Sequence, residues 1–175
     1  MIDDVARQFI EAQHVFFVAS APLDAGGHVN LSPKGLDTFR ILGPSTVAYV
    51  DFNGNRVETI AHLKENGRIV LMFCAFQGPP DIFRLYGRGR LVEPHEAEFA
   101  ALAESFATCE NARSIIVVEV SRVTDSCGYG VPLFKYEGER EQLFAWARNR
   151  GQERLKAYRA EKNRQSIDGL PGVFE

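Results

Sequence analysis

Residues 82–92 read Ile-Phe-Arg-Leu-Tyr-Gly-Arg-Gly-Arg-Leu-Val, and their chemical character alternates strictly along the chain. Alternate residues of an extended strand point to opposite faces of a sheet. One face therefore carries the side chains of Arg84, Tyr86, Arg88 and Arg90. The opposite face carries Leu85, Gly87, Gly89 and Leu91. This second face is apolar, and its glycines allow another surface to approach closely.

Five further stretches have the apolar content or alternation of strands: Val15–Ala19, His28–Ser32, Thr46–Phe52, Arg68–Gln77 and Ser114–Thr124. Pro33 is expected to end the second of them. Most of the six strands are separated by hairpin-length turns, and no regular strand–helix–strand alternation appears. The pattern predicts a mainly β (α+β) fold, a small six-stranded antiparallel barrel with peripheral helices.

Helical segments are expected between and after these strands. Asp3 or Asp4 can cap a first helix, and Pro94 suits the first turn of another. A helix between Asn55 and Gly67 would have Asn55 as its N-cap and Gly67 just after its end. Residues 139–163 predict one long C-terminal helix, or two helices broken at Gly151.

The chain has 175 residues, of which 45% are hydrophobic, 25% charged and 11% aromatic, the composition of one compact domain spanning 1–175. Its helical extension begins at about residue 139. No apolar run approaches the 18 residues of a membrane span, and the first residues do not resemble a secretion signal. We therefore expect a cytoplasmic protein without a membrane partner, whose three separated cysteines stay reduced.

The net charge of −3 conceals a basic segment, since residues 140–164 hold eight Lys and Arg against three Asp and Glu. We interpret this segment as the exposed side of the last helix, and we do not expect nucleic acid as a partner. The basic side of residues 84–90 could attract an anionic substrate. The alternative is a solvated or dimer-facing surface that pairs with acidic residues.

Conventional catalytic motifs are missing from the sequence. The four histidines lie in separate segments without ligand spacing, so no metal site is expected. Neither a nucleophile elbow nor a nucleotide-binding glycine loop is present. Cys127 lies between polar and glycine residues without a neighbouring base, and we interpret it as a structural or incidental thiol.

Two loops combine a strand end with a cation. In residues 51–59, Asp-Phe-Asn-Gly-Asn-Arg-Val-Glu-Thr, a strand ends at a glycine turn, and Asn55 and Arg56 open the next helix. Backbone N–H groups at such a point, together with a guanidinium, suit a phosphate group. A capped surface turn with a solvated arginine is the equal alternative. Ser32-Pro33-Lys34-Gly35 places a hydroxyl and an ammonium at another strand end.

The order of these pieces resembles the pyridoxamine 5′-phosphate oxidase-like flavoproteins. The resemblance comprises Ser-Pro-Lys-Gly after one strand, Asp-x-x-Gly-Asn-Arg after the next, then the apolar strand and residues 84–90, so it covers about Val15 to Val92. Residues 126–132 and 166–172 look like those of an uncharacterised bacterial branch of this superfamily.

The resemblance implies a six-stranded split barrel and a homodimer with FMN in clefts at its interface. Asn55 and Arg56 fall where the family grips the FMN phosphate, with Lys34 or Arg84 as further cations. Ser32 is expected near the isoalloxazine ring or the ribityl chain. The chain departs from the family at Val57–Glu58, where a second cation is usual.

The resemblance therefore predicts an FMN-dependent oxidoreductase acting on an unknown small molecule, because flavin carries its own redox chemistry. One alternative is a non-catalytic module that binds flavin, haem or another planar cofactor on the same barrel. Another is that the deazaflavin F420 replaces FMN. Residues 166–172 contain turn-forming residues and are expected to pack onto a body, the chain's own or its partner's, and to border the flavin cleft; a plain surface tail is the alternative.

Overall fold

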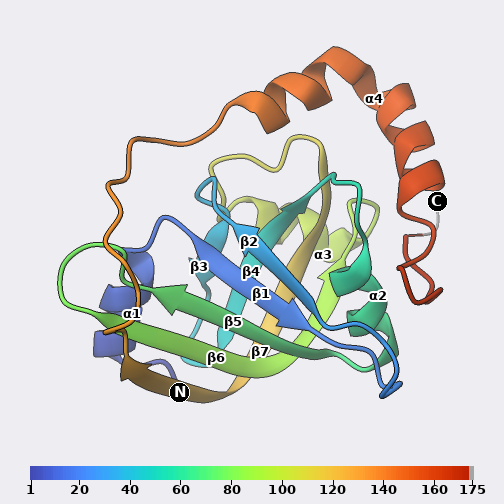
Figure 1. Cartoon of the computed structure of the whole chain (residues 1–175). Coiled ribbons are helices and arrows are strands. Elements are labelled where there is room, and N and C mark those ends of the chain that lie inside the picture. Colours follow the sequence, from blue (N-terminus) through green and yellow to red (C-terminus); the bar gives the residue numbers. More distant parts are fainter. Residues whose placement is uncertain (174–175) are drawn as a thin grey trace.

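The computed structural model describes residues 1–173, so the last two residues of the expected 1–175 domain lie outside the described residues. A seven-stranded antiparallel sheet, in the order β2-β1-β5-β6-β7-β4-β3, curls into a half-barrel (Figure 1). The strands are β1 Phe16–Ser20, β2 Asn30–Lys34, β3 Phe39–Ile41, β4 Thr46–Phe52, β5 Arg68–Cys74, β6 Asp81–Val92 and β7 Ala112–Cys127. The helices are α1 Asp4–Glu11, α2 Glu58–Glu65, α3 Ala97–Ala103 and α4 Gln142–Lys162.

The split-barrel class is confirmed, but the expected number of six strands is wrong. The additional strand is β3, which pairs with β4 over only three residues. A segment this short shows no periodicity, and it follows Leu36 and Asp37, which both have positive φ.

The expectation that Pro33 ends a strand is also wrong. β2 continues through Pro33 to Lys34, with Pro33 opposite Phe17 of β1. β2 is an edge strand, and the missing N–H of proline is tolerated at an edge because no neighbouring strand requires it.

The core lies inside the curled sheet and is built by alternation. Val47 and Tyr49 of β4 point inward with Leu85 of β6, whereas Ala48 and Val50 point outward. α3 covers the outward residues of β4 and β7, and α1 closes one end of the barrel through Ala6 and Ile10. In the part of the chain that the structure describes, no helix crosses the outer face of β1, β5 and β6 (Figure 1).

The C-terminal part of the chain forms an arm and a tail. The arm, residues 128–162, contains an extended connection and α4, and it arches over the barrel (Figure 1). Gly151 has φ +70°, so α4 consists of two helical halves that meet at this glycine, one of the two forms expected. The tail, residues 163–173, returns to the barrel and packs beside α2, where Val173 joins Val57 and Ile60. Packing of the tail onto a body is thereby confirmed, and the body is the chain's own.

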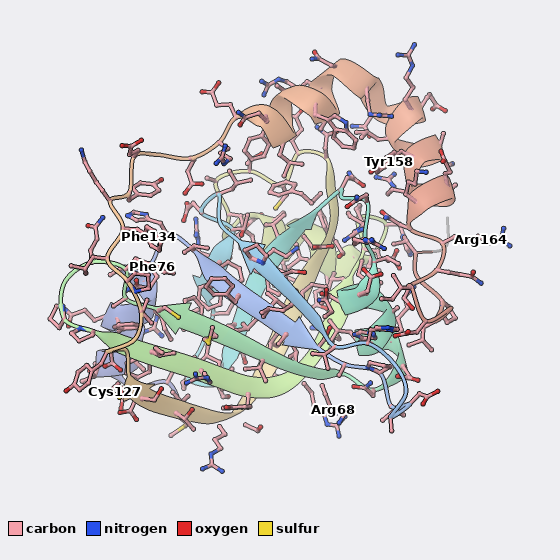
Figure 2. The ribbon with its side chains drawn as sticks, viewed as in Figure 1. Arg68, Phe76, Cys127, Phe134, Tyr158 and Arg164 are labelled. Carbon is pink, nitrogen blue, oxygen red and sulfur yellow. The ribbon has the colours of Figure 1, made fainter. Side chains whose placement is uncertain are left out.

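Aromatic contacts hold the arm in place. Phe134 lies against Phe76, with 5.5 Å between ring centroids and a backbone hydrogen bond between the two residues (Figure 2). The imidazole of His14 stacks on Tyr136 at 3.6 Å. Phe144 of α4 contacts Phe52 at the end of β4. These contacts set the space between the arm and the barrel.

Candidate functional site

The candidate site begins where the two edges of the split sheet face each other. Lys34, the last residue of β2, extends its ammonium across the split to Asp51 of β4, at 2.9 Å. On the other side of the same carboxylate, Arg113 of β7 donates from Nε and Nη2 to Oδ2, at 2.9 and 2.7 Å. The split is therefore closed at this rim by one carboxylate held between two cations.

Two members of this ion cluster are almost fully buried, because Asp51 is 2% exposed and Arg113 6%, whereas the Lys34 side chain is 23% exposed. Burial alone would raise the pKa of Asp51. The charges of Arg113 and Lys34 and their hydrogen bonds outweigh that effect and lower the pKa to about 2. Asp51 is thus ionised at neutral pH. Of its two cationic partners, the sequence analysis assigned Lys34 to the flavin phosphate and did not single out Arg113.

The loop after β4, residues 53–57, carries Asn55 and Arg56 with both side chains exposed. Its backbone is held from below, since Gly54 O accepts from Asn163 and Arg56 O accepts from Arg113, at 2.9 and 2.8 Å. The prediction that Asn55 caps the next helix is wrong. α2 begins at Glu58, and its N-cap is Val57, whose N–H donates to the Glu58 carboxylate at 3.0 Å.

A cleft of about 1330 Å³ lies between the barrel rim and the arm, and Lys34 and Asn55 both line it. Its aromatic lining comes from β1, from the β5–β6 loop and mainly from the arm: Phe17, Phe76, Phe134, Tyr136, Trp146 and Tyr158. The cationic lining is Lys34, Lys135, Arg140 and Arg150. Aromatic walls with a few convergent polar groups are typical of cofactor and ligand sites. This set of side chains fits a planar ligand that carries negative charge.

One wall of the cleft is a compact aromatic cluster on α4. The rings of Trp146 and Tyr158 meet edge to face at 5.2 Å, and the Arg150 guanidinium lies over both, at 4.8 and 5.0 Å. The bend at Gly151 brings these residues, from the two halves of α4, to one place. Cation–π contacts of this kind hold a guanidinium in position without neutralising its charge.

The structure brings some of the predicted site residues together and separates others. Ser32 lies two residues before Lys34 on the same face of β2 and donates to Asn30 at 3.3 Å. The Arg56 side chain has no partner among residues 1–173 and does not line the cleft wall, although its neighbour Asn55 does. Arg84 lies on the outer face of β6, 2.9 Å from Ser126, and does not line the cleft.

Sequence reasoning missed the two residues that organise the loop, Arg113 and Asn163. Arg113 lies at the irregularity where β4 pairs with β7, but no local pattern distinguishes a buried arginine from an exposed one. Asp51 belonged to the Asp-x-x-Gly-Asn-Arg pattern and was given no role there. Among residues 1–173, no group of three or more His, Cys, Asp or Glu could hold a metal ion, and no helix is long and apolar enough to cross a membrane.

Comparisons of the sequence with known proteins give two matches to one family. A family profile described as pyridoxamine 5′-phosphate oxidase matches residues 2–127. A pyridoxamine 5′-phosphate oxidase family protein of Aspergillus flavus, ustO, is 37% identical over 191 residues, which span 98% of this chain and 76% of that protein.

Two solved structures show the same fold at lower sequence identity. HupZ from Group A Streptococcus has a TM-score of 0.56 at 21% identity, over 71% of this chain and 94% of that one. An FMN-binding protein from Syntrophomonas wolfei has a TM-score of 0.50, also at 21% identity, over 74% of this chain and 86% of that one.

Proposed function

Because the chain belongs to the pyridoxamine 5′-phosphate oxidase family, we propose that it is a homodimeric flavoprotein that binds FMN and oxidises or reduces a small molecule. The observation that carries this proposal is the cleft under the arm, where aromatic walls and cations meet the loop of residues 53–57. The FMN-binding protein from Syntrophomonas wolfei supports the choice of cofactor.

Arg56 is the principal phosphate ligand in this proposal. The Lys34 ammonium is already held by Asp51, a carboxylate that it shares with Arg113. Arg56 is exposed, has no partner among residues 1–173, and stands beside Asn55, which lines the cleft. A guanidinium can bind a phosphate through two parallel hydrogen bonds. Asn55 and the backbone N–H groups of the loop complete the grip, and Ser32 remains a candidate for the ribityl chain or the ring.

The aromatic lining of the cleft would exclude water from the ring system, and Lys135, Arg140 and Arg150 would favour an anionic substrate. Bound FMN would supply the redox chemistry.

The homodimer is proposed from the uncovered outer face of β2, β1 and β5. Leu31 and Pro33 point outward from β2 opposite Ala19 and Phe17 of β1, and Phe17 in turn lies opposite Met72 of β5. Leu31 is 61% exposed. A contiguous apolar face of this kind typically binds another protein. A second copy docked here would also border the cleft, because Phe17 and Pro33 belong to its lining.

Titration of the purified protein with FMN, followed by quenching of flavin fluorescence, tests the cofactor. We expect binding at micromolar or lower concentrations, weakened about ten- to a hundred-fold in Arg56→Ala because a charge-assisted hydrogen bond is lost. Arg164→Ala is the matched control, since it removes an exposed arginine whose side chain points away from the barrel (Figure 2). Absence of binding by the unaltered protein would refute the proposal.

Two further measurements test the remaining parts. Light scattering on Leu31→Glu should give a monomer. Val5→Glu, which alters an even more exposed apolar residue on α1, should remain a dimer. Steady-state NADPH consumption above that of free FMN would support an oxidoreductase. If the protein binds FMN but consumes no NADPH with any acceptor tested, it is a cofactor-binding module.

A further inference from the structure

The tail contacts both residues at which this chain departs from the family pattern, Val57 and Glu58. Val57 is buried and clusters with Ile60 and Val173. The Glu58 carboxylate accepts a hydrogen bond from the N–H of Ile167 at 3.2 Å through one oxygen and from Val57 through the other. The positions expected to carry a second phosphate cation therefore serve as the docking surface of the C-terminal tail.

Asn163 is the point at which the tail, the loop and the barrel meet. It is 0% exposed and follows the last residue of α4. Its side-chain amide donates to Gly54 O at 2.9 Å and accepts from Arg113 at 2.8 Å. Its backbone carbonyl accepts from Val173 N at 2.9 Å. One buried residue thus forms hydrogen bonds with Gly54, Arg113 and Val173, which are more than 40 residues apart from one another in the sequence.

Arg113 extends this connection beneath the loop. Its Nη1 donates both to Asn163 and to Arg56 O, while Nε and Nη2 hold Asp51. The two bonds by which Asn163 and Arg113 reach the loop, at Gly54 and Arg56, both end on backbone carbonyls. The side chains of Asn55 and Arg56 take no part in them and stay exposed.

We propose that the tail, anchored through Asn163, holds the loop of residues 53–57 in the conformation that receives the flavin phosphate. Asn163 is then a positioning residue, which acts on the phosphate only through Gly54 and Arg113. A preorganised loop compensates for the phosphate affinity lost with the second cation that this chain lacks. The loop is already ordered before FMN binds, so binding carries no entropic cost of ordering it. This inference rests on the proposed FMN site.

The test compares Asn163→Ala with the unaltered full-length protein in titrations with FMN and with riboflavin, which lacks the phosphate. The expected result is an FMN dissociation constant raised about ten-fold, which corresponds to about one hydrogen bond that the released loop no longer makes to the phosphate, with the riboflavin constant unchanged. The preference for FMN over riboflavin then falls by the same factor. A general loss of structure would weaken the binding of FMN and of riboflavin alike. An unchanged preference for FMN over riboflavin would therefore overturn the inference.

Asn66→Ala is the matched control. Asn66 is the C-cap of α2 and also donates from its side-chain amide to a loop carbonyl, that of Ala21, but it lies at the opposite end of α2 from the loop. Its replacement should leave the preference for FMN unchanged. An equal fall in Asn66→Ala would show that the effect is not specific to Asn163 and would overturn the inference.

A second variant, Gly172→Ala, serves if Asn163→Ala does not fold. A Cβ at position 172 would collide with the carbonyl oxygen of Asn163 and approach Val57 to 2.9 Å, so it displaces the tail without removing Asn163. The same fall in preference is expected. Hydrogen exchange of residues 53–57 without flavin gives an independent readout, because both variants should exchange faster there than the unaltered chain. If the unaltered protein binds no flavin, the proposed function fails, while faster exchange would still show the tether.

Discussion

Replacement of Asp51 by asparagine tests the ion cluster on which the rim of the barrel depends. The substitution keeps the size of the side chain and removes its charge. Arg113 would keep a buried guanidinium without its anion, since it is only 6% exposed, and the Lys34 ammonium would lose its partner across the split. No other carboxylate is hydrogen-bonded to Arg113 among residues 1–173.

The expected cost follows from the burial. Removing one partner of a buried ion pair costs about 3–5 kcal/mol, because the remaining charge stays desolvated. Asp37→Asn is the matched control, since it breaks an ion pair with Arg40 in which the carboxylate is 68% exposed. Such exposed pairs contribute less than about 1 kcal/mol.

The pH dependence gives a second, independent signature. Asp51 has its pKa lowered from 3.8 to about 2 in the folded protein, a change equivalent to about 2 kcal/mol of stability. The folded carboxyl binds its proton more weakly than the unfolded one. This contribution is therefore complete above about pH 4 and is lost as the pH falls through about 2.

Urea unfolding followed by tryptophan fluorescence at several pH values measures both effects. Asp51→Asn should lose about 3–5 kcal/mol at pH 7, and its difference from the unaltered chain should shrink by about 2 kcal/mol towards pH 2. A loss at pH 7 no larger than that of Asp37→Asn would refute the reasoning. So would a difference that stays constant between pH 7 and pH 2.

Two further predictions concern the core. Gly87→Ala should destabilise the fold by about 1–3 kcal/mol, because its Cβ would meet the carbonyl oxygen of Glu119 on β7. Gly130→Ala should leave the stability unchanged, because a Cβ there has nothing within 4 Å. Equal thermal midpoints of the two variants would contradict this prediction. Burial lowers the pKa of His62, although the charges of Asp168, Glu58 and Glu65 oppose this shift. The contribution of His62 to the free energy of unfolding is therefore complete above about pH 6.5 and is lost as the pH falls below that value. Unfolding free energies at pH 7.5 and 5.5 should therefore differ less in His62→Gln than in the unaltered protein, and an identical difference would exclude this origin.

The strands were predictable where a local pattern was long enough to read. β6 shows its two faces through strict alternation, and the structure places Leu85 inside and Arg84 outside. β3 was missed because three residues have no period, and Pro33 was misjudged because edge position is a property of the whole sheet. Gly67 and Gly151 were interpreted correctly, since a positive φ is a local requirement that glycine meets most easily.

The candidate site was predictable only in its loops. Lys34 and Asn55 were singled out as ligands and do line one cleft, but Lys34 also neutralises Asp51, a contact that the sequence could not reveal. The aromatic wall on α4 was unexpected, because Trp146 and Tyr158 meet only through the bend at Gly151. Arg84, also proposed from the sequence, lies apart from this arrangement on the outer face of the sheet.

By itself the sequence determined the class of fold, the loops that carry cations, and the two positions, Val57 and Glu58, that depart from the family. Each of these is a local property, set by side-chain periodicity, turn chemistry or a motif of a few residues. Only the tertiary structure decided what these two residues contact. Asn163 and Val173 reach the loop from more than 100 residues away, and such contacts depend on how the chain closes on itself. A buried amide that joins separate segments has no signature along the chain, because its partners are adjacent only in space.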